Sequence, residues 1–375
     1  MTLYARYRLG RLLDMVFPKS RLALAPGLAA RLAAVPLQVI DVGGAMGPDR
    51  RWAQLPEGAV RFMTFEPDAR SQEDGIVKNG WHVSLPIGLA DKPGERALHL
   101  TDAPFASSLY KPNEYVLREF AIWPWYAPAG LAAIRVDTLD NCVARLPNWR
   151  ADFVKVDVEG AELDVLKGGQ RTLETAFGVQ IEVAFVTRNI GAPLQPDVDR
   201  WLREAGFTPY LLFREHWIRA NKLHGALSQP QLIWADAVYF RDRAWIVEQI
   251  ARAGSPEEAE TRLCVVLAIL LVYNAHDYAA EVIAAVSKTG AIQAHVTCAA
   301  QESVSGSLTS LGAYVARGTI ALLLALFVAA PLALAGTRGR GVGRDIIAAQ
   351  AAPLFDVLSR WARRSGLDHS CVSDL

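Results

Sequence analysis

A glycine-rich turn with an acidic residue at its start is the first feature of this sequence that could support chemistry. Asp41 ends an apolar run, residues 39–42, that predicts a buried strand, and Gly43, Gly44 and Gly47 follow it. Glycines allow a backbone to turn tightly and to approach a ligand closely. An acidic side chain at the end of the strand favours a cationic or hydroxylated ligand.

A second acidic residue, Glu66, ends the next predicted strand, residues 61–66, and Pro67 stops that strand. A carboxylate at this position can accept hydrogen bonds from the two hydroxyls of a ribose. Together, the glycine turn and Glu66 predict a nucleoside-containing cofactor in the crevice at the strand ends.

The composition of the turn narrows the choice of cofactor. The glycine spacing, Gly43-x-x-x-Gly47, is not the G-x-G-x-x-G pattern of a dinucleotide site, and the turn has no lysine of a P-loop. No basic residue in the turn balances a pyrophosphate. A cofactor with a positive centre, such as the sulfonium of S-adenosylmethionine, is therefore favoured. A nicotinamide-dependent oxidoreductase is the rival enzyme, and its expected loop is missing.

A second acidic group follows a later strand. Asp157 ends the predicted strand 152–158 and Glu159 comes directly after it, so both side chains are expected to face the crevice. Lys155 lies within the same apolar strand and needs a partner, for which we predict Glu182 on the next strand. Hard cations also bind carboxylates, so a metal site built from Asp157, Glu159 and Glu182 is an alternative. We predict that no metal is bound.

The elements that must position these residues alternate along the chain. Strands separated by helices imply βαβ units and a mostly parallel sheet, with helices on both of its faces. The predicted strands are 39–42, 61–66, 81–87, 152–158, 178–186, 211–213 and 237–240, and the predicted helices between them are 161–173 and 197–205.

The sequence becomes helical after a break at Gly254. Ser255 can cap a helix and Pro256 fits its first turn, and the pattern beyond predicts a helical hairpin. The predicted organisation is a basic N-terminal helical segment, an α/β domain, and a helical C-terminal region with an apolar segment. Their bounds are 1–35, 36–245, 255–375 and, for the apolar segment, 318–337.

Composition excludes several classes of protein. The 375 residues are 51% hydrophobic and carry no formal net charge, which argues against intrinsic disorder and against a nucleic-acid partner. The four cysteines form no C-x-x-C pair, and no signal-peptide pattern follows the early arginines. We therefore expect a cytoplasmic location. The basic N-terminal helix and the segment 318–337 leave peripheral contact with the inner face of a membrane as an alternative.

Several stretches occur in an order that resembles FkbM-type methyltransferases. They are Asp41 to Gly47, Phe65-Glu66-Pro67, Ser107-Ser108-Leu109-Tyr110, Val136-Asp137-Thr138-Leu139-Asp140 and Lys155-Val156-Asp157-Val158-Glu159-Gly160-Ala161-Glu162-Leu163. The resemblance covers about residues 38–243. It implies a class I, Rossmann-like fold that uses S-adenosylmethionine. The implied activity is O-methylation of a sugar, a surface glycan or a related hydroxylated metabolite.

The resemblance also implies roles for individual residues at the cofactor. The glycine turn would line the methionyl end, Glu66 would hold the ribose, and Asp91 would lie near the adenine. The cofactor-binding residues predicted in this way are Asp41, Gly43, Gly44, Gly47, Glu66 and Asp91.

Methyl transfer to an alcohol is an in-line displacement that a general base assists. Asp157 is expected to face the reacting centre, and Asp157, Glu159 and His216 are the candidate bases. The predicted partner is a small-molecule or glycan substrate. The alternative to an enzyme is a scaffold that binds the cofactor without turnover and docks partners or membrane through its helical region.

Overall fold

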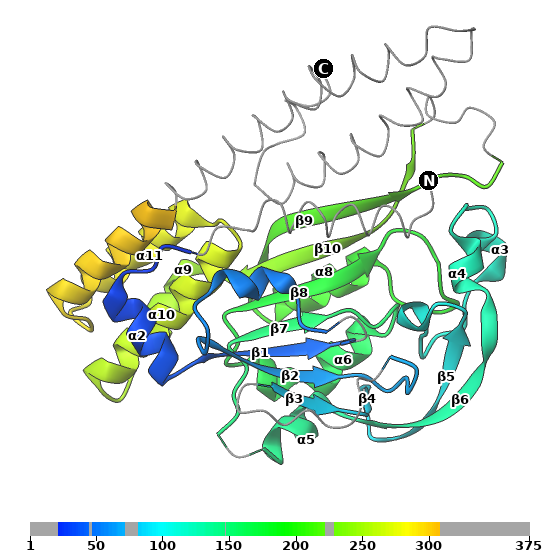
Figure 1. Ribbon diagram of the computed structural model, residues 1–375, viewed down its shortest axis with the longest axis horizontal. Helices are drawn as coiled ribbons and strands as arrows, with labels where there is room; N and C mark the ends of the chain where they lie inside the picture. The colour runs from blue at the N-terminus through cyan, green and yellow to red at the C-terminus, as the bar shows by residue number, and fades with distance from the viewer. Residues whose placement is uncertain (1–21, 45–46, 72–81, 147, 222–228, 308–375) are drawn as a thin grey trace, which may run out of the picture.

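A mostly parallel, seven-stranded sheet forms the centre of the molecule in a computed structural model (Figure 1). The structure describes residues 22–44, 47–71, 82–146, 148–221 and 229–307. In spatial order the strands are β3 (His82–Leu85), β2 (Val60–Phe65), β1 (Leu37–Val42), β7 (Phe153–Val156), β8 (Gly178–Ala184), β10 (Gln231–Arg241) and β9 (Phe207–Trp217).

The strand order reverses between β1 and β7. From β1 the chain moves outward through β2 to β3, and it later returns to pair β7 with the other side of β1. The strands from β3 to β8 are parallel, and β10 runs antiparallel to both β8 and β9. In sheets of this kind, ligands bind outside the carboxyl ends of the strands at the reversal point. The predicted site residues Asp41 and Asp157 flank this point.

Helices cover both faces of the sheet, because alternate strand residues point to opposite sides. In β1, Leu37 and Val39 belong to one apolar cluster, and Ile40 and Val42 belong to the other. The fold therefore confirms the predicted α/β class. The helices of one face are α2 (Pro26–Ala34), α9 (Arg243–Ala251), α10 (Pro256–Val272) and α11 (His276–Ser287), and those of the other are α5 (Leu139–Ala144), α6 (Glu162–Gly168), α7 (Gln170–Leu173) and α8 (Gln195–Glu204).

The C-terminal helices share a core with the sheet. Every residue of α10 from Leu263 onward is buried, and these side chains lie in one cluster with Val39 and Phe153 of the strands. A helix that is apolar on all sides needs such enclosure. As predicted, Ser255 caps α10 by accepting a hydrogen bond from the Glu258 N–H (3.2 Å). The helices α9 to α11 thus complete the packing of one sheet face.

A second, smaller sheet lies beside the strand ends, and the sequence did not reveal it. It consists of β4 (Gly88–Leu89), β6 (Pro128–Asp137) and β5 (Gly94–Thr101), in that order. Most of β6 is exposed or half-buried, unlike the central strands, although many of its residues are apolar. The short helices η2 (Pro104–Ala106), α3 (Glu114–Leu117) and α4 (Trp123–Tyr126) lie between β5 and β6.

Other predictions differ from the structure in extent. The predicted helix 161–173 is divided into α6 and α7 at Gly169, and the predicted strands 211–213 and 237–240 are parts of the longer β9 and β10. The basic segment before residue 22 and the apolar segment 318–337 lie outside the described residues. Among the described helices, none combines the length and the apolar character that crossing a membrane requires.

Candidate functional site

A cavity lies at the carboxyl ends of β1, β2 and β7, where the order of the strands reverses. Gly43, Glu66, Asp157 and Glu159 line it from the central sheet, and the loop around Phe105 closes it from the second sheet. We call it the strand-end cavity. Its volume, about 60 Å³, is far below the roughly 300–1,000 Å³ of ligand pockets.

The glycine turn forms one wall of the strand-end cavity. The Gly43 and Gly44 N–H groups donate to the Phe65 carbonyl oxygen (3.0 and 3.1 Å), and the Asp157 N–H donates to that of Val42 (2.9 Å). Gly43 has φ +92°, and a Cβ atom there would lie 1.7 Å from the Asp157 carbonyl oxygen. Only glycine permits this approach of the β1 and β7 loops.

Lys155 bridges the two predicted acidic residues at this reversal point. Its Nζ lies 3.4 Å from Asp41 Oδ1 and 3.2 Å from Asp157 Oδ2. The predicted pairing of Lys155 with Glu182 is wrong, because Lys155 lies opposite Asp41 in β1 and opposite Gln180, not Glu182, in β8. Burial raises the pKa of Asp41 to about 6, although Lys155 opposes the rise.

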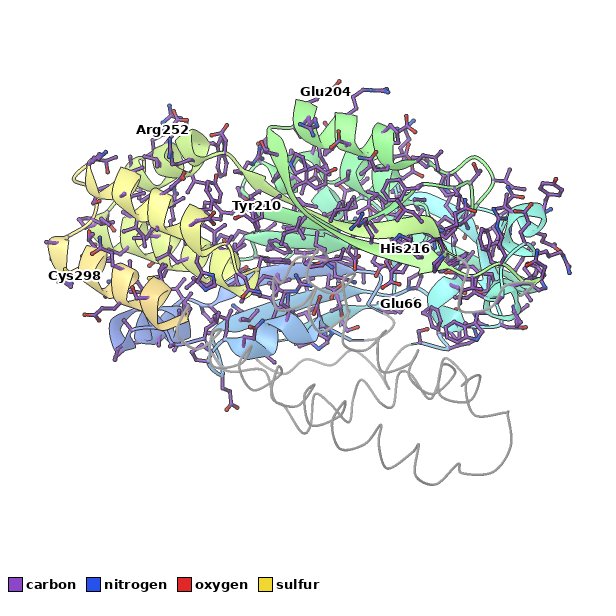
Figure 2. The ribbon with its side chains drawn as sticks, turned by 90° about the horizontal axis from the view of Figure 1, so that it is seen from above. Glu66, Glu204, Tyr210, His216, Arg252 and Cys298 are labelled. Carbon is purple, nitrogen blue, oxygen red and sulfur yellow. The ribbon has the colours of Figure 1, made fainter. Side chains whose placement is uncertain are left out.

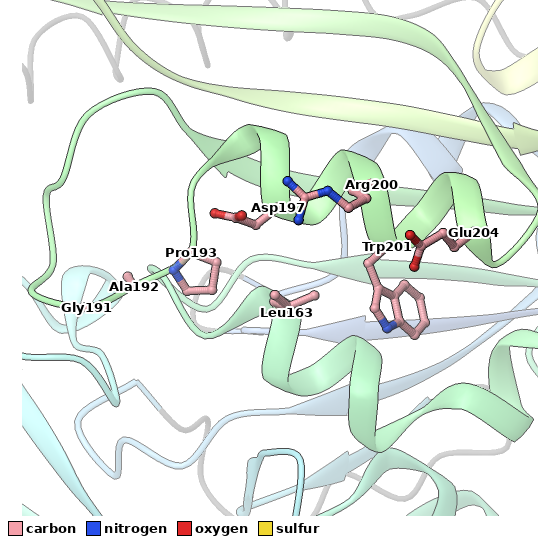
Figure 3. A pocket seen from close by; sticks show the side chains of 8 residues that line it. All are labelled: Leu163, Gly191, Ala192, Pro193, Asp197, Arg200, Trp201 and Glu204. Carbon is pink, nitrogen blue, oxygen red and sulfur yellow. The ribbon is translucent and has the colours of Figure 1, made fainter.

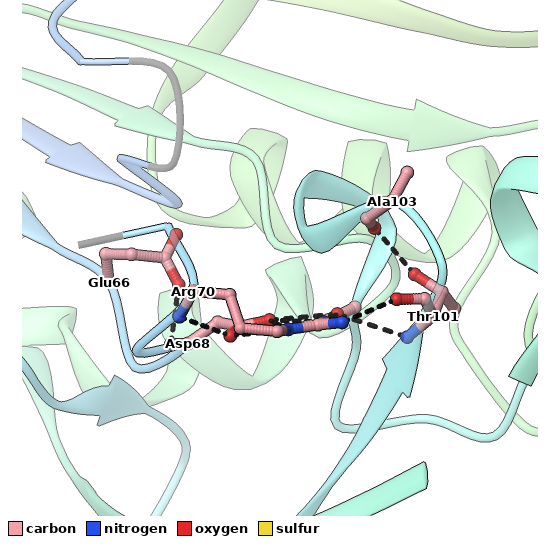
Figure 4. Close-up of polar contacts among 6 residues, drawn as sticks. Glu66, Asp68, Arg70, Thr101 and Ala103 are labelled. Carbon is pink, nitrogen blue, oxygen red and sulfur yellow. Dashed lines mark hydrogen bonds and ion pairs between the residues drawn. The ribbon is translucent and has the colours of Figure 1, made fainter. Parts of the chain in front are cut away.

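Glu66 is buried at the end of β2 and belongs to a polar network that connects the two sheets (Figure 4). Its Oε1 accepts a hydrogen bond from the Asp68 N–H (2.7 Å). Asp68 pairs with Arg70, whose guanidinium also donates to the Thr101 carbonyl oxygen (2.9 Å) and to Ser107 Oγ (2.9 Å). The network ties the Phe105 loop of the second sheet to the Glu66 end of β2.

A second ionic network lies behind the other wall of the cavity. The Arg188 guanidinium is 2% exposed, and it donates to Glu159 Oε2 (2.9 Å), to Glu182 Oε1 and to the Tyr126 hydroxyl (3.3 Å). Glu159 has φ +56°, and Ser108 Oγ donates to its carbonyl oxygen (2.7 Å). Burial raises the pKa of Glu159 to about 7, and the charge of Arg188 opposes that rise.

The same carboxylates are the metal alternative raised by the sequence. One oxygen atom from each of Asp157, Glu159 and Glu182 can be chosen so that all three lie within 4.8 Å of one another. Arg188 already donates to Glu159 and Glu182. The guanidinium therefore supplies a counter-charge to two of the three carboxylates.

The structure separates two of the predicted residues from this cluster. His216 is exposed near the end of the outer strand β9, opposite Leu232 of β10 (Figure 2). Three strand spacings of about 4.8 Å place β9 roughly 14 Å from β7. Asp91 follows β4 and pairs with Arg96 (3.4 Å), and it does not line the strand-end cavity, although neighbouring Leu89 does.

Gly47 and Asp41 lie near the cavity without lining it. Gly47 has φ +71°, and its N–H closes the turn on the Gly44 carbonyl oxygen (2.9 Å). Asp41 is 1% exposed and contacts the cavity wall through Lys155. Arg188 was not predicted from the sequence, because a single arginine beyond a strand gives no signal until its buried acidic partners are placed around it.

A larger groove, of about 440 Å³, lies between α6 and α8 (Figure 3). Leu163, Pro193 and Trp201 form its apolar part, and Arg200 and Glu204 lie at its rim. None of the predicted site residues lines this α6–α8 groove. The strand-end cavity remains the candidate site, because the acidic residues and the glycine turn converge there.

Part of the chain matches a known protein family. Residues 51–209 match the family model described as the methyltransferase FkbM domain. No curated protein matches the chain.

Two solved structures are similar over part of the chain. One is a methyltransferase FkbM from Methylobacillus flagellatus KT, with 14% identity and a TM-score of 0.30 over 55% of this chain and 43% of that one. The chain thus spans less than half the length of that protein. The other is a putative RNA methyltransferase from Pyrococcus horikoshii, with 12% identity and a TM-score of 0.25 over 64% and 98% of the two chains.

The family match begins after the glycine turn and extends into β9, so it includes Glu66, Asp157, Glu159, Glu182 and Arg188. The residues that converge on the strand-end cavity from β2, β7 and β8 all lie within it. Most of the candidate site therefore lies in the part of the chain that matches the methyltransferase FkbM domain.

Proposed function

We propose that this protein transfers the methyl group of S-adenosylmethionine to a hydroxyl oxygen of a sugar, a surface glycan or a related hydroxylated metabolite. The proposal rests on the observation that predicted cofactor and catalytic residues line the same cavity. Gly43, Glu66, Asp157 and Glu159 come from three strands and line one cavity at the reversal point of the sheet.

The groups around the strand-end cavity suit a cofactor with a positive centre. Asp41, Asp157, Glu159 and Glu182 gather near it, and the cations that pair with them are Lys155 and Arg188. When bound, the cofactor supplies a methyl group on a positively charged sulfur. The surplus of carboxylates favours that charge over a phosphate.

In this proposal Glu66 holds the ribose. A carboxylate has two oxygens and about four acceptor positions, so Glu66 can accept hydrogen bonds from ribose hydroxyls in addition to the Asp68 N–H. The network from Asp68 through Arg70 to Ser107 keeps this end of β2 in place.

An aromatic wall suits a sugar acceptor. Phe105 lines the strand-end cavity and is 39% exposed, and Trp125 supports its ring edge-to-face at 5.4 Å between centroids. The apolar face of a sugar ring can pack on such a ring while its hydroxyls meet the nearby carboxylates. Holding the acceptor oxygen in line with the methyl group supplies most of the catalysis.

The experiment that tests the function is transfer of a labelled methyl group from S-adenosylmethionine into fractions of a cell extract. We expect one fraction of hydroxylated metabolites or glycans to become labelled. Asp157→Asn should lower the rate on the order of 10²-fold, because it removes a charge beside the reacting centre. Glu204→Gln, in the α6–α8 groove, is the matched control and should transfer normally.

Two outcomes of this experiment would contradict the proposed function or its site. Cofactor binding without labelling of any fraction would contradict transfer and favour the scaffold that docks partners or membrane. Equal loss in Asp157→Asn and Glu204→Gln would remove the strand-end cavity as the site.

A further inference from the structure

We propose that Arg188 is a positioning residue that holds the Glu159 carboxylate as the proton acceptor for the substrate hydroxyl. The inference rests on the proposed function and identifies the group at that site that takes the proton. Arg188 itself does not line the strand-end cavity, whereas Glu159 does.

The Arg188 contacts fix where the Glu159 carboxylate lies. One guanidinium nitrogen donates to Glu159 Oε2 (2.9 Å) and the other donates to Glu182 Oε1. The Arg188 backbone is also held, because its N–H donates to the Val186 carbonyl oxygen (2.8 Å) and its carbonyl oxygen accepts from the Asn113 N–H (2.7 Å). A guanidinium held at both ends leaves the Glu159 side chain little rotational freedom.

Other acidic residues nearby are less suited to accept the proton. Asp157 is engaged by Lys155, whose Nζ lies 3.2 Å from Asp157 Oδ2. Glu162 Oε1 accepts hydrogen bonds from the Val158 and Gly160 N–H groups (3.1 and 3.0 Å), so that carboxylate braces the loop after β7. Glu66 and Asp68 also line the cavity, but they belong to the Arg70 network at the end of β2, which leaves Glu159.

Charged groups from four elements act on Glu159. Asp157 follows β7, Glu162 begins α6 and Glu182 lies in β8, and their negative charges favour the protonated form of Glu159. The positive charge of Arg188 opposes them, and the Tyr126 hydroxyl of α4 accepts a hydrogen bond from Arg188. Burial raises the pKa of Glu159 to about 7, which suits a base that works near neutral pH.

The proposed step conserves atoms and charge. The acceptor hydroxyl gives its proton to the Glu159 carboxylate as its oxygen forms a bond to the methyl carbon. The bond between that carbon and the cofactor sulfur breaks, and its electron pair stays on sulfur. Glu159 then releases the proton to water, and the negative charge on its carboxylate is restored beside Arg188.

The test removes either Arg188 or its second acidic partner, Glu182, and measures the titration of the Glu159 carboxylate. The full chain is labelled with ¹³C at the glutamate carboxyl carbons, and Glu159→Gln assigns the signal. Arg188→Gln removes a positive charge, so the midpoint of Glu159 should rise by about one pH unit or more. Glu182→Gln removes a carboxylate of the same bridge, so the midpoint should fall or stay unchanged.

A purely structural role for Arg188 predicts a different result. Loss of packing would move the Glu159 midpoint in the same direction in Arg188→Gln and Glu182→Gln, and that outcome would overturn the proposal, as would an unchanged midpoint in Arg188→Gln. If Arg188→Gln does not fold, Arg188→Lys replaces it. Lysine keeps the positive charge but lacks the planar guanidinium with its two donating nitrogens. The Glu159 titration midpoint should therefore stay within about half a pH unit of wild type, while the rate of methyl transfer falls.

Transfer measurements separate this inference from the proposed function. With labelled S-adenosylmethionine and the accepting extract fraction, the acid limb of the wild-type rate should follow the Glu159 titration, and Arg188→Gln should recover activity as the pH rises. Glu159→Gln should lose on the order of 10²-fold or more in rate at unchanged cofactor affinity. If wild type transfers no methyl group, the proposed function fails, while the titration still tests the Arg188 bridge.

Discussion

The central strands have two ends of opposite chemistry on the same face of the sheet. In β1, Val39 is completely buried among the C-terminal helices, and two residues later Asp41 is buried beside a lysine. In β7, Phe153 packs in the same apolar cluster, and two residues later Lys155 pairs with two acids. On the same face of the sheet, the side chains thus change from apolar to ionic within two residues of each strand.

The two ends differ in whether they add to stability or reduce it. Apolar packing between the strands and α10 stabilises the fold. Burial at the other end raises the pKa values of Asp41 to about 6 and of Glu159 and Asp236 to about 7. Raised carboxyl pKa values mean that charging these groups at neutral pH costs free energy. The end of the sheet with the strained, charged groups is the end that can act on a ligand.

The largest effect is expected from placing a charge at the apolar end. Leu267 of α10 is completely buried. Leu267→Asp should lower the free energy of unfolding by about 4 kcal/mol or more, because the carboxylate would have no partner there. Chemical denaturation measures the change. Ala280→Asp, at an exposed position of α11, is the control and should change stability by less than about 1 kcal/mol.

A smaller loss is expected where the β1 and β7 loops meet. Gly43→Ala should cost about 3 kcal/mol, because its Cβ would overlap the Asp157 carbonyl oxygen. Gly47→Ala is the matched control, since Gly47 also has positive φ but a Cβ atom there would meet none of the described residues within 4 Å. It should cost only about 1 kcal/mol. Equal unfolding free energies for the two variants would show that the loops do not need this close approach.

Removing the central cation should make stability more dependent on pH. Lys155→Met leaves Asp41 without its counter-charge, so the pKa of Asp41, already raised to about 6 by burial, should rise further. Because the folded-state pKa exceeds the unfolded value, stability is retained at low pH and lost as pH increases. Thermal unfolding should show a loss of about 2 kcal/mol at pH 8 and less at pH 5. A loss of unfolding free energy that is the same at both pH values would show that the Lys155–Asp41 ion pair is not its cause.

One substitution should increase stability. The pKa of Asp236 is raised by burial from 3.8 to about 7, so the folded state loses stability as pH rises through that interval. Asp236→Asn cannot ionise. Its unfolding free energy should exceed that of wild type at pH 8, and the gain should disappear near pH 4. A gain of equal size at both pH values would point to packing instead.

Sequence patterns predicted the central strands well because their residues are buried on both faces. The runs that became β1, β2, β7 and β8 are mostly apolar, and the acids at their ends were correctly placed at one edge. The three-stranded second sheet was missed because β5 and β6 are largely exposed. Its loop nevertheless supplies Phe105 to the cavity wall.

Ionic partners were harder to predict than the elements that carry them. Lys155 was recognised as a buried cation, but its partner depended on the register between β1 and β7. Arg188 has no periodic pattern around it, and its role becomes visible only when Glu159 and Glu182 are brought to either side of it. His216 has the right chemistry for a base but lies on the outer strand of the sheet.

The most direct test of the account is calorimetric titration of the full chain with S-adenosylmethionine, in wild type, Glu66→Gln and the exposed control Glu57→Gln. We predict that wild type and Glu57→Gln bind with equal affinity. Glu66→Gln should bind roughly 10- to 100-fold more weakly, because it loses charged hydrogen bonds to the ribose. No binding by wild type at millimolar concentration, or equal affinity in Glu66→Gln, would contradict the strand-end cavity as the cofactor site.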